Sequence, residues 1–189
     1  MRYAVLLKGI NVGGKNIVRM DDLKQLLLAL GLCKVKTYIQ SGNAIFETAL
    51  DEAVLHETIR TGFIDRFGFE SDVLIRGEDE MRLLIERLPF TALEIAAARA
   101  ADPQAQHLYV YFLDHTPKQM QIDTICRECA GEDILRTGKR ELYLLCRQSI
   151  RKSKLAACIT KVFDSATARN WKTVNQLYAM MRDKGDEHV

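Results

Sequence analysis

The residues best suited to chemistry follow the first apolar run of the chain, in the stretch LLKGINVGGKN at residues 6–16. Gly9-x-x-x-x-Gly14-Lys15 fits seven positions of the phosphate-binding loop, whose backbone N–H groups surround phosphates while its lysine reaches the terminal ones. The eighth position, a magnesium-binding Ser or Thr in that loop, is Asn16. An extended segment also follows, whereas a nucleotide loop opens a helix at its lysine. Both departures argue against a magnesium-nucleotide site.

A simpler anion site is compatible with the same stretch. Gly13 and Gly14 permit positive φ angles, and consecutive N–H groups there can surround an anion between Lys8 and Lys15. The alternative is a turn that needs glycine for its shape and has no ligand. The sequence leaves both interpretations open.

A second candidate lies near the C-terminus, in TARNWKTV at residues 167–174. Asn170 is expected to cap the last helix by accepting a hydrogen bond from the N–H of residue 172 or 173. Arg169 would then lie beside a helix N-terminus, which suits a phosphate or carboxylate. The predicted contacts of an anionic ligand are Lys8, Gly13, Gly14, Lys15, Asn16, Lys154, Arg169 and Asn170.

The remaining reactive side chains indicate no catalytic or metal site. Five cysteines, an odd number, favour free thiols. Cys126 and Cys129 form a C-x-x-C pair, but a zinc site needs two further ligands at similar spacing, and no second pair or H-x-x-x-H exists. The role of these two thiols stays open. We predict no metal and no cofactor, and nominate no catalytic residue.

Charge is distributed unevenly, although the net charge is only +2. The balance is +5 over residues 1–40, −10 over residues 41–135 and +8 over residues 136–172. The two basic stretches either meet in one positive surface or remain separate solvated faces. No apolar run approaches the roughly 20 residues that span a bilayer, and the N-terminus lacks a cleavage signal. We therefore expect a cytoplasmic protein without a membrane partner.

Hydrophobic periodicity predicts the elements that position these residues. In residues 1–77 the order is strand, helix, two strands of a hairpin, helix and strand, which is the ferredoxin-like βαββαβ arrangement. The expected elements are strand 3–8, helix 20–30, strands 35–40 and 44–47 around the turn Ser41-Gly42-Asn43, helix 51–67 and strand 72–76.

The same order recurs in the second half of the chain, where Gly138 takes the hairpin place of Gly42. We predict an α+β fold of two ferredoxin-like βαββαβ units, an internal structural duplication, with a first unit at 1–77, a helical connector at 78–106, and a second unit plus C-terminal helix at 107–189. The expected elements are helix 78–88, a further helix or linker near 92–101, strand 107–113, helix 117–130, strands 133–136 and 141–146, helix 152–163, strand 166–169 and helix 171–182.

Tyrosines on this second predicted sheet raise the question of RNA, because ferredoxin-like sheets can stack bases on exposed aromatic rings. Tyr109 and Tyr111 share one face of a strand, and Tyr143 lies on another strand. Packing of these rings inside the protein is the alternative.

Four separated motifs, KGINVGGKN, YIQSGN, SKL and TARNWKTV, occur in this order in a bacterial family. The sequence thus resembles the family of domains of unknown function numbered 1697 over essentially its whole length. The resemblance implies two related α+β subdomains and brings no established activity, catalytic residue or cofactor.

The sequence therefore favours a protein that binds a nucleotide, a phosphorylated small molecule or nucleic acid at a basic surface. Two alternatives stay open. One is an enzyme acting on a phosphorylated metabolite, which would need a general acid or base in a cleft. The other is a non-catalytic oligomer or partner-binding protein, whose oligomeric state the sequence does not fix.

Overall fold

Two antiparallel sheets form the framework of the protein in the computed structural model, which describes residues 1–129 and 131–183. The chain divides into two units: Met1–Leu83 with Asn175–Val189, and Leu84–Val174. The last helix thus begins in the second unit and ends in the first. The sequence predicted a division into residues 1–77, 78–106 and 107–189, which assigns the whole of that helix to the second unit. This predicted division into domains stays a prediction.

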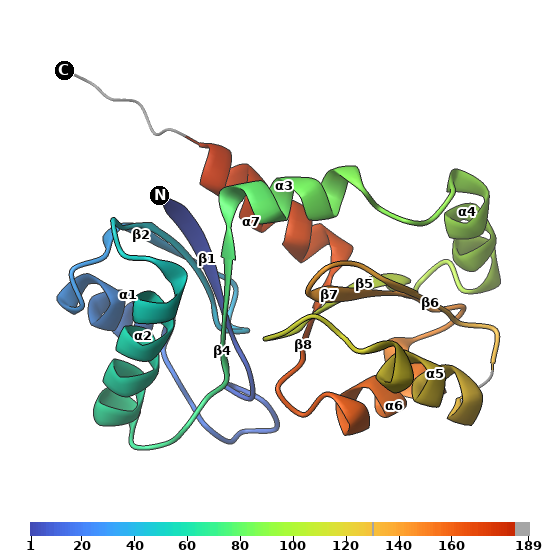
Figure 1. The fold of residues 1–189 in the computed structure, drawn as a ribbon, viewed down its shortest axis with the longest axis horizontal. Helices are drawn as coiled ribbons and strands as arrows, with labels where there is room; N and C mark the ends of the chain where they lie inside the picture. The colour runs from blue at the N-terminus through green and yellow to red at the C-terminus, as the bar shows by residue number, and fades with distance from the viewer. Residues whose placement is uncertain (130, 184–189) are drawn as a thin grey trace. The chain divides into compact units, whose positions relative to one another are not determined.

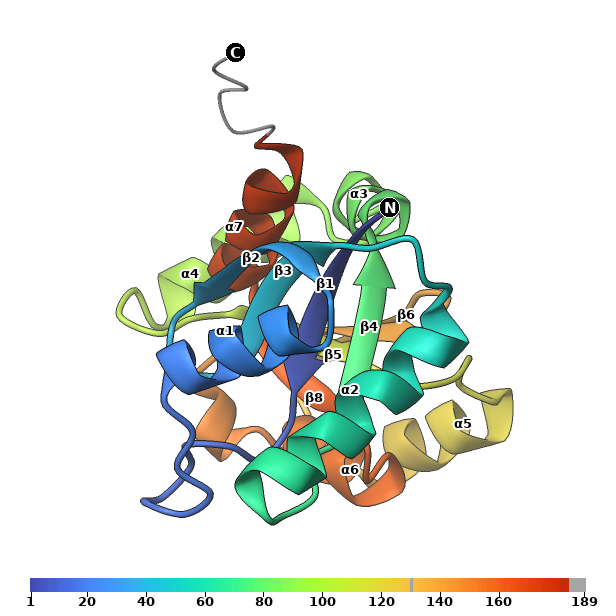
Figure 2. The same ribbon diagram turned by 90° about the vertical axis from the view of Figure 1, so that its left-hand side faces the viewer.

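The first unit is a four-stranded sheet with the strand order β2-β3-β1-β4. Figure 2 shows α1 and α2 together on one face of this sheet. The elements are β1 (Arg2–Leu7), α1 (Met20–Ala29), β2 (Cys33–Tyr38), β3 (Asn43–Glu47), α2 (Glu52–Phe67) and β4 (Val73–Gly77), followed by α3 (Glu78–Glu86).

Local sequence signals account for these elements. The side chain of Asp51 accepts a hydrogen bond from the Val54 N–H at the start of α2, and Gly68 ends the helix in the left-handed conformation. Leu55, Ile59 and Phe63 recur at helical spacing along its buried face. They pack against the alternate residues of the strands that face the helices, in the same hydrophobic core.

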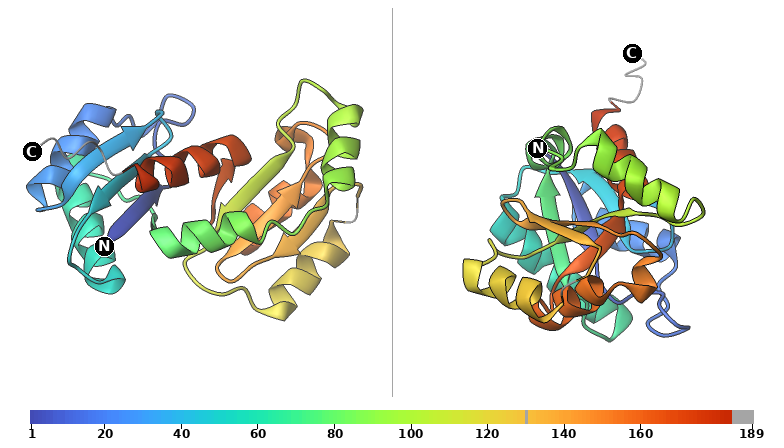
Figure 3. Two further views of the ribbon diagram at one scale, coloured as in Figure 1. Left: turned by 90° about the horizontal axis from the view of Figure 1, so that it is seen from above. Right: turned by 90° about the vertical axis from the view of Figure 1, so that its right-hand side faces the viewer.

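The second unit repeats this topology, with the strand order β6-β7-β5-β8. Figures 1 and 3 show α5 and α6 together on one face of its sheet. The elements are α4 (Ala92–Ala101), β5 (Leu108–Phe112), α5 (Gln119–Glu128), β6 (Ile134–Thr137), β7 (Glu141–Leu145), a 3-10 helix η1 (Ile150–Lys152), α6 (Lys154–Val162), β8 (Thr167–Asn170) and α7 (Trp171–Arg182).

The equivalent strand orders confirm the predicted α+β fold with two βαββαβ units. In each unit the first strand pairs antiparallel with both the third and the fourth, as β1 does with β3 and β4. The predicted end of helix 117–130 falls on Ala130, which lies outside the described residues; α5 ends at Glu128. The predicted helix 152–163 instead starts at Lys154, because Ser153 separates it from η1 and caps it through the Ala156 N–H.

No helix in the described part of the chain combines the length and apolarity needed to cross a bilayer. Tyr111 and Tyr143 are buried, at 4% and 2% exposure, so packing accounts for these two rings. The Tyr143 hydroxyl donates a hydrogen bond to the carbonyl of Leu84 within the same unit.

Candidate functional site

The glycine-rich loop that follows β1 is a small hairpin. Val12 and Lys15 form an isolated antiparallel bridge, and the Lys15 N–H donates to the Val12 carbonyl over 3.1 Å. Gly13 and Gly14 between them have φ angles of +59° and +75°. Positive φ at both central residues is the mark of a type I′ turn, which favours glycine for its backbone geometry alone. Turn shape therefore explains this glycine pair without a ligand.

Two asparagine side chains hold the loop in place. The Asn11 amide donates to the carbonyls of Val18 and Gln40 and accepts from the Val18 N–H, each over 2.8 Å. Asn16 Nδ2 donates to the Gly9 carbonyl over 3.0 Å. The amide of Asn16 is thus engaged within the loop, although the residue is exposed.

The lysines of the loop differ in their surroundings. Lys8 Nζ lies 3.6 Å from Asp72 Oδ2. Lys15 is exposed at the turn and forms no ion pair with a described residue.

Arg169 is buried in the second unit, with 7% exposure. Its Nη1 donates to Thr167 Oγ1 over 2.7 Å and to the Ala168 carbonyl over 2.8 Å. Burial lowers the pKa of Arg169 to about 10. This environment is that of a core residue of β8 and weighs against direct contact with a dissolved anion.

The other two predicted contacts of this unit lie at helix starts. Asn170 Oδ1 accepts from the Thr173 N–H over 2.8 Å, which confirms the predicted cap of α7. Lys154 is exposed at the first position of α6. The predicted contacts are therefore divided, with Lys8 and residues 13–16 in the first unit and the others in the second. Ligand binding by these residues stays a prediction.

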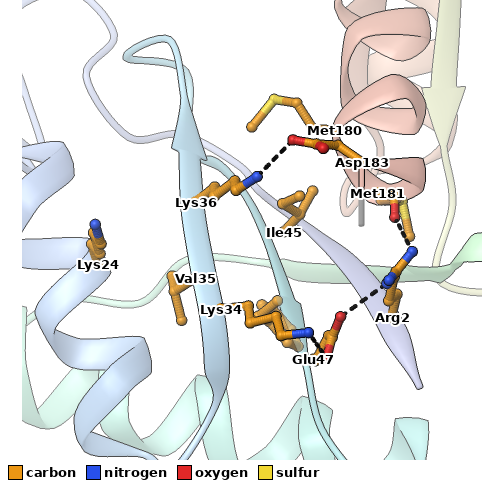
Figure 4. Close-up of a pocket in the computed structure, with 11 residues that line it drawn as sticks. Arg2, Lys24, Lys34, Val35, Lys36, Ile45, Glu47, Met180, Met181 and Asp183 are labelled. Atoms are coloured by element: carbon orange, nitrogen blue, oxygen red, sulfur yellow. Dashed lines mark hydrogen bonds and ion pairs between the residues drawn. The ribbon is translucent and has the colours of Figure 1, made fainter. Parts of the chain in front are cut away.

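A groove that the sequence did not single out lies in the first unit (Figure 4). It has a volume of about 340 Å³ and lies where α1, the β2–β3 hairpin and the end of α7 come together with Arg2 of β1. Arg2 pairs across the sheet with Glu47, at the end of the strands opposite the glycine loop. The lining residues are Arg2, Lys24, Lys34, Val35, Lys36, Ile45, Phe46, Glu47, Met180, Met181 and Asp183.

Ion pairs organise the groove, as the dashed lines in Figure 4 show. Glu47 accepts from Arg2 Nε over 2.9 Å and lies 3.2 Å from Lys34 Nζ. Hydrogen bonds from Arg2 first, and then from Lys34, lower the pKa of Glu47. On the α7 side, Lys36 Nζ lies 2.9 Å from Asp183 Oδ2. Arg2 Nη1 also donates to the Met181 carbonyl over 2.8 Å, so it ties the last turn of α7 to the sheet.

The groove combines positive charge with an apolar lining. Four cations face two carboxylates, and Lys24 forms no ion pair with a described residue. All four cations come from the basic stretch at residues 1–40, which was the only signal of the groove in the sequence. The apolar part of the lining is Val35, Ile45, Phe46, Met180 and Met181. Such a surface can bind an anion that also carries an apolar group.

The structure gives the cysteines a different arrangement from the expected one. Cys129 and Cys158 are joined in a disulfide, so the prediction of free thiols is wrong for these two. It failed because α5 and α6 are far apart in sequence and pack together in the fold. Cys33, Cys126 and Cys146 are free. Within the described residues, no three histidine, cysteine or acidic side chains are grouped so that they could hold a metal ion.

The fold and motifs together define a class of duplicated ferredoxin-like α+β proteins. The chain belongs to the DUF1697 family, described as "protein of unknown function", whose model matches residues 1–143. A solved structure with the same fold is that of the conserved bacterial protein SP0830 from Streptococcus pneumoniae. It is 26% identical, with a TM-score of 0.72, and the match covers 96% of this chain and 98% of that one. Comparison with curated proteins finds no match.

Proposed function

We propose that this protein binds a small organic anion with an apolar part in the groove of the first unit. The observation that carries the proposal is the presence of four cations around one apolar lining. The anion would be a carboxylate, sulfonate or phosphate, and its apolar part would lie against Ile45 and the two methionines. Methionine side chains adapt to ligands of different shape.

The ion pairs of the groove leave its cations available to a ligand. The side chains of Lys34 and Lys36 are 55% and 46% exposed, so their ammonium groups remain in contact with water. Exposed ion pairs of this kind contribute only about 0.2–1 kcal/mol each. A ligand anion can therefore replace Asp183 at Lys36 at low cost. Lys24 forms no ion pair with a described residue, so a ligand anion can bind it without displacing a carboxylate.

Binding suits the groove better than catalysis. Its acidic groups, Glu47 and Asp183, both face cations. A lowered carboxyl pKa, as at Glu47, keeps that group ionised at neutral pH and makes it a weak base. The enzyme and oligomer alternatives have no comparable observation in their support.

The proposal can be tested with an aromatic sulfonate dye. Anilinonaphthalene sulfonate carries both the anion and the apolar group, and N-phenylnaphthylamine has the same rings without the sulfonate. We expect the dye to bind the native protein with a rise in fluorescence. The double variant Lys24→Glu/Lys36→Glu should weaken its affinity by about tenfold, which corresponds to about 1.4 kcal/mol. Affinity for the neutral analogue should change less than twofold.

A matched control variant makes the same change in net charge at two lysines that do not line the groove. Lys15→Glu/Lys139→Glu alters two exposed lysines at turns, and we expect it to leave dye affinity within about twofold, since salt screens exposed charges that do not contact the ligand. Absence of dye binding to the wild type would refute the proposal. So would an equal loss in both double variants, which would show a general charge effect. A loss only in the control pair would favour binding at Lys15 or Lys139 instead.

A further inference from the structure

The disulfide of the second unit lies at the wall of a separate cavity. Cys129 ends α5, and its N–H donates to the Ile125 carbonyl over 3.0 Å. Its partner Cys158 lies in α6, with the two Cα atoms 6.7 Å apart. Cys129, but not Cys158, lines a cavity of about 390 Å³. Cys129 is 8% exposed and Cys158 is the more exposed of the two, but only Cys129 can be reached by a molecule that is bound in this cavity.

The cations on the wall of this cavity have no acidic partner. Arg147, Lys152 and Lys154 all line it, and none forms an ion pair with a described residue. Of the two acidic residues on the wall, Asp133 is turned towards the backbone, where its Oδ1 accepts from the Arg147 N–H over 2.9 Å. The three cations outnumber the two carboxylates, Glu132 and Asp133, which makes the cavity favourable for an anion.

We propose that Cys129–Cys158 is a reversible disulfide that exchanges with a small carboxylate-bearing thiol bound in this cavity. The thiolate of the small molecule attacks Cys129 Sγ, and the electron pair of the disulfide leaves on Cys158 as a thiolate, which takes up a proton. The product is a mixed disulfide at Cys129. A second small thiolate attacks the outer sulfur and releases Cys129. Two thiols are thereby oxidised to one disulfide while the protein disulfide is reduced to two thiols.

In this scheme, the charge of the small thiol determines how fast it reacts with the disulfide. The cations attract a thiol that carries carboxylates and repel one that carries an ammonium group alone. The arrangement thus selects among thiols by charge.

The test compares two thiols of opposite charge on the full-length protein. Oxidised protein is treated with glutathione or cysteamine, quenched with an alkylating reagent, and analysed by peptide mass spectrometry over time. We expect glutathione to form its mixed disulfide at Cys129. In Lys152→Glu/Lys154→Glu the ratio of glutathione to cysteamine rates should fall by about tenfold, because two attractive charges become repulsive.

Two controls make the result specific. Lys139→Glu/Lys172→Glu makes the same change in net charge and should leave the rate ratio unchanged. In Cys158→Ser, oxidised glutathione should leave an adduct on Cys129, because the thiol that closes the native disulfide is absent. The proposal is overturned if untreated protein is alkylated at both Cys129 and Cys158, if adducts form only at Cys33 or Cys126, or if the rate ratio is equal in all proteins.

Discussion

Asn11 offers a quantitative test of the conclusion that the glycine-rich loop is built for shape. Its side chain makes three hydrogen bonds of 2.8 Å to the backbone of Val18 and Gln40, from a residue at a φ angle of +55°. A net hydrogen bond contributes about 1 kcal/mol, and alanine tolerates positive φ less well than asparagine does. Because one bond is exposed to solvent, we expect Asn11→Ala to lower the free energy of unfolding by about 2–3 kcal/mol.

Urea unfolding followed by circular dichroism measures this loss, and two matched variants calibrate it. Asn11→Asp keeps the acceptor for the Val18 N–H and the tolerance of positive φ, but turns an oxygen without a proton towards the carbonyls of Val18 and Gln40, so it should lose about as much as Asn11→Ala. Asn16→Ala removes one exposed bond, of 3.0 Å to the Gly9 carbonyl, at a residue that also has a positive φ of +52°, and the two effects together should cost about 1 kcal/mol. If Asn11→Ala costs under about 0.5 kcal/mol, or no more than Asn16→Ala, the side chain does not hold the loop and our explanation is wrong.

Three further predictions follow from individual residues. Gly14→Ala should cost about 1–2 kcal/mol in thermal unfolding, because φ is +75° there and only the backbone conformation opposes a Cβ. Burial raises the pKa of Cys146 to about 12, so iodoacetamide at pH 8 should modify exposed Cys126 and leave Cys146 unmodified, as peptide mass spectrometry would show. The pKa of Glu47 is lowered in the folded protein, so its stabilising contribution is present above its unfolded pKa and lost as pH falls through the folded one. The stability difference between wild type and Glu47→Gln should therefore shrink in urea titrations from pH 7 to pH 3.

The sequence predicted most of the fold because its signals are local. The turn Ser41-Gly42-Asn43 predicted the first hairpin, in which Gly42 has a φ of +73° and a Cβ would lie 2.8 Å from Ile10 Cδ1. The last helix, Trp171–Arg182, has the predicted bounds. Its signals, the apolar stripe and the Asn170 cap, both involve residues that are close together in the sequence.

The candidate site was not predictable in the same way. The groove joins Arg2 to the end of α7, with a separation of 179 positions between Arg2 and Met181, and no local pattern reports such a contact. The burial of Arg169 likewise depends on the register of β8, where it pairs with Val110 of β5. A cation beside a predicted helix start suggested an exposed site, but strand pairing placed this side chain in the interior.

The most direct test of the central claim maps the bound anion residue by residue. Backbone amide resonances are recorded by two-dimensional NMR while anilinonaphthalene sulfonate is added to the wild-type protein. If the dye binds in the groove, the amides of residues 33–36 and 45–47 will shift with one common saturation curve, and those of residues 9–16 will not move. Shifts confined to residues 9–16, or no saturable shift in residues 33–36 and 45–47, would contradict the proposed anion site.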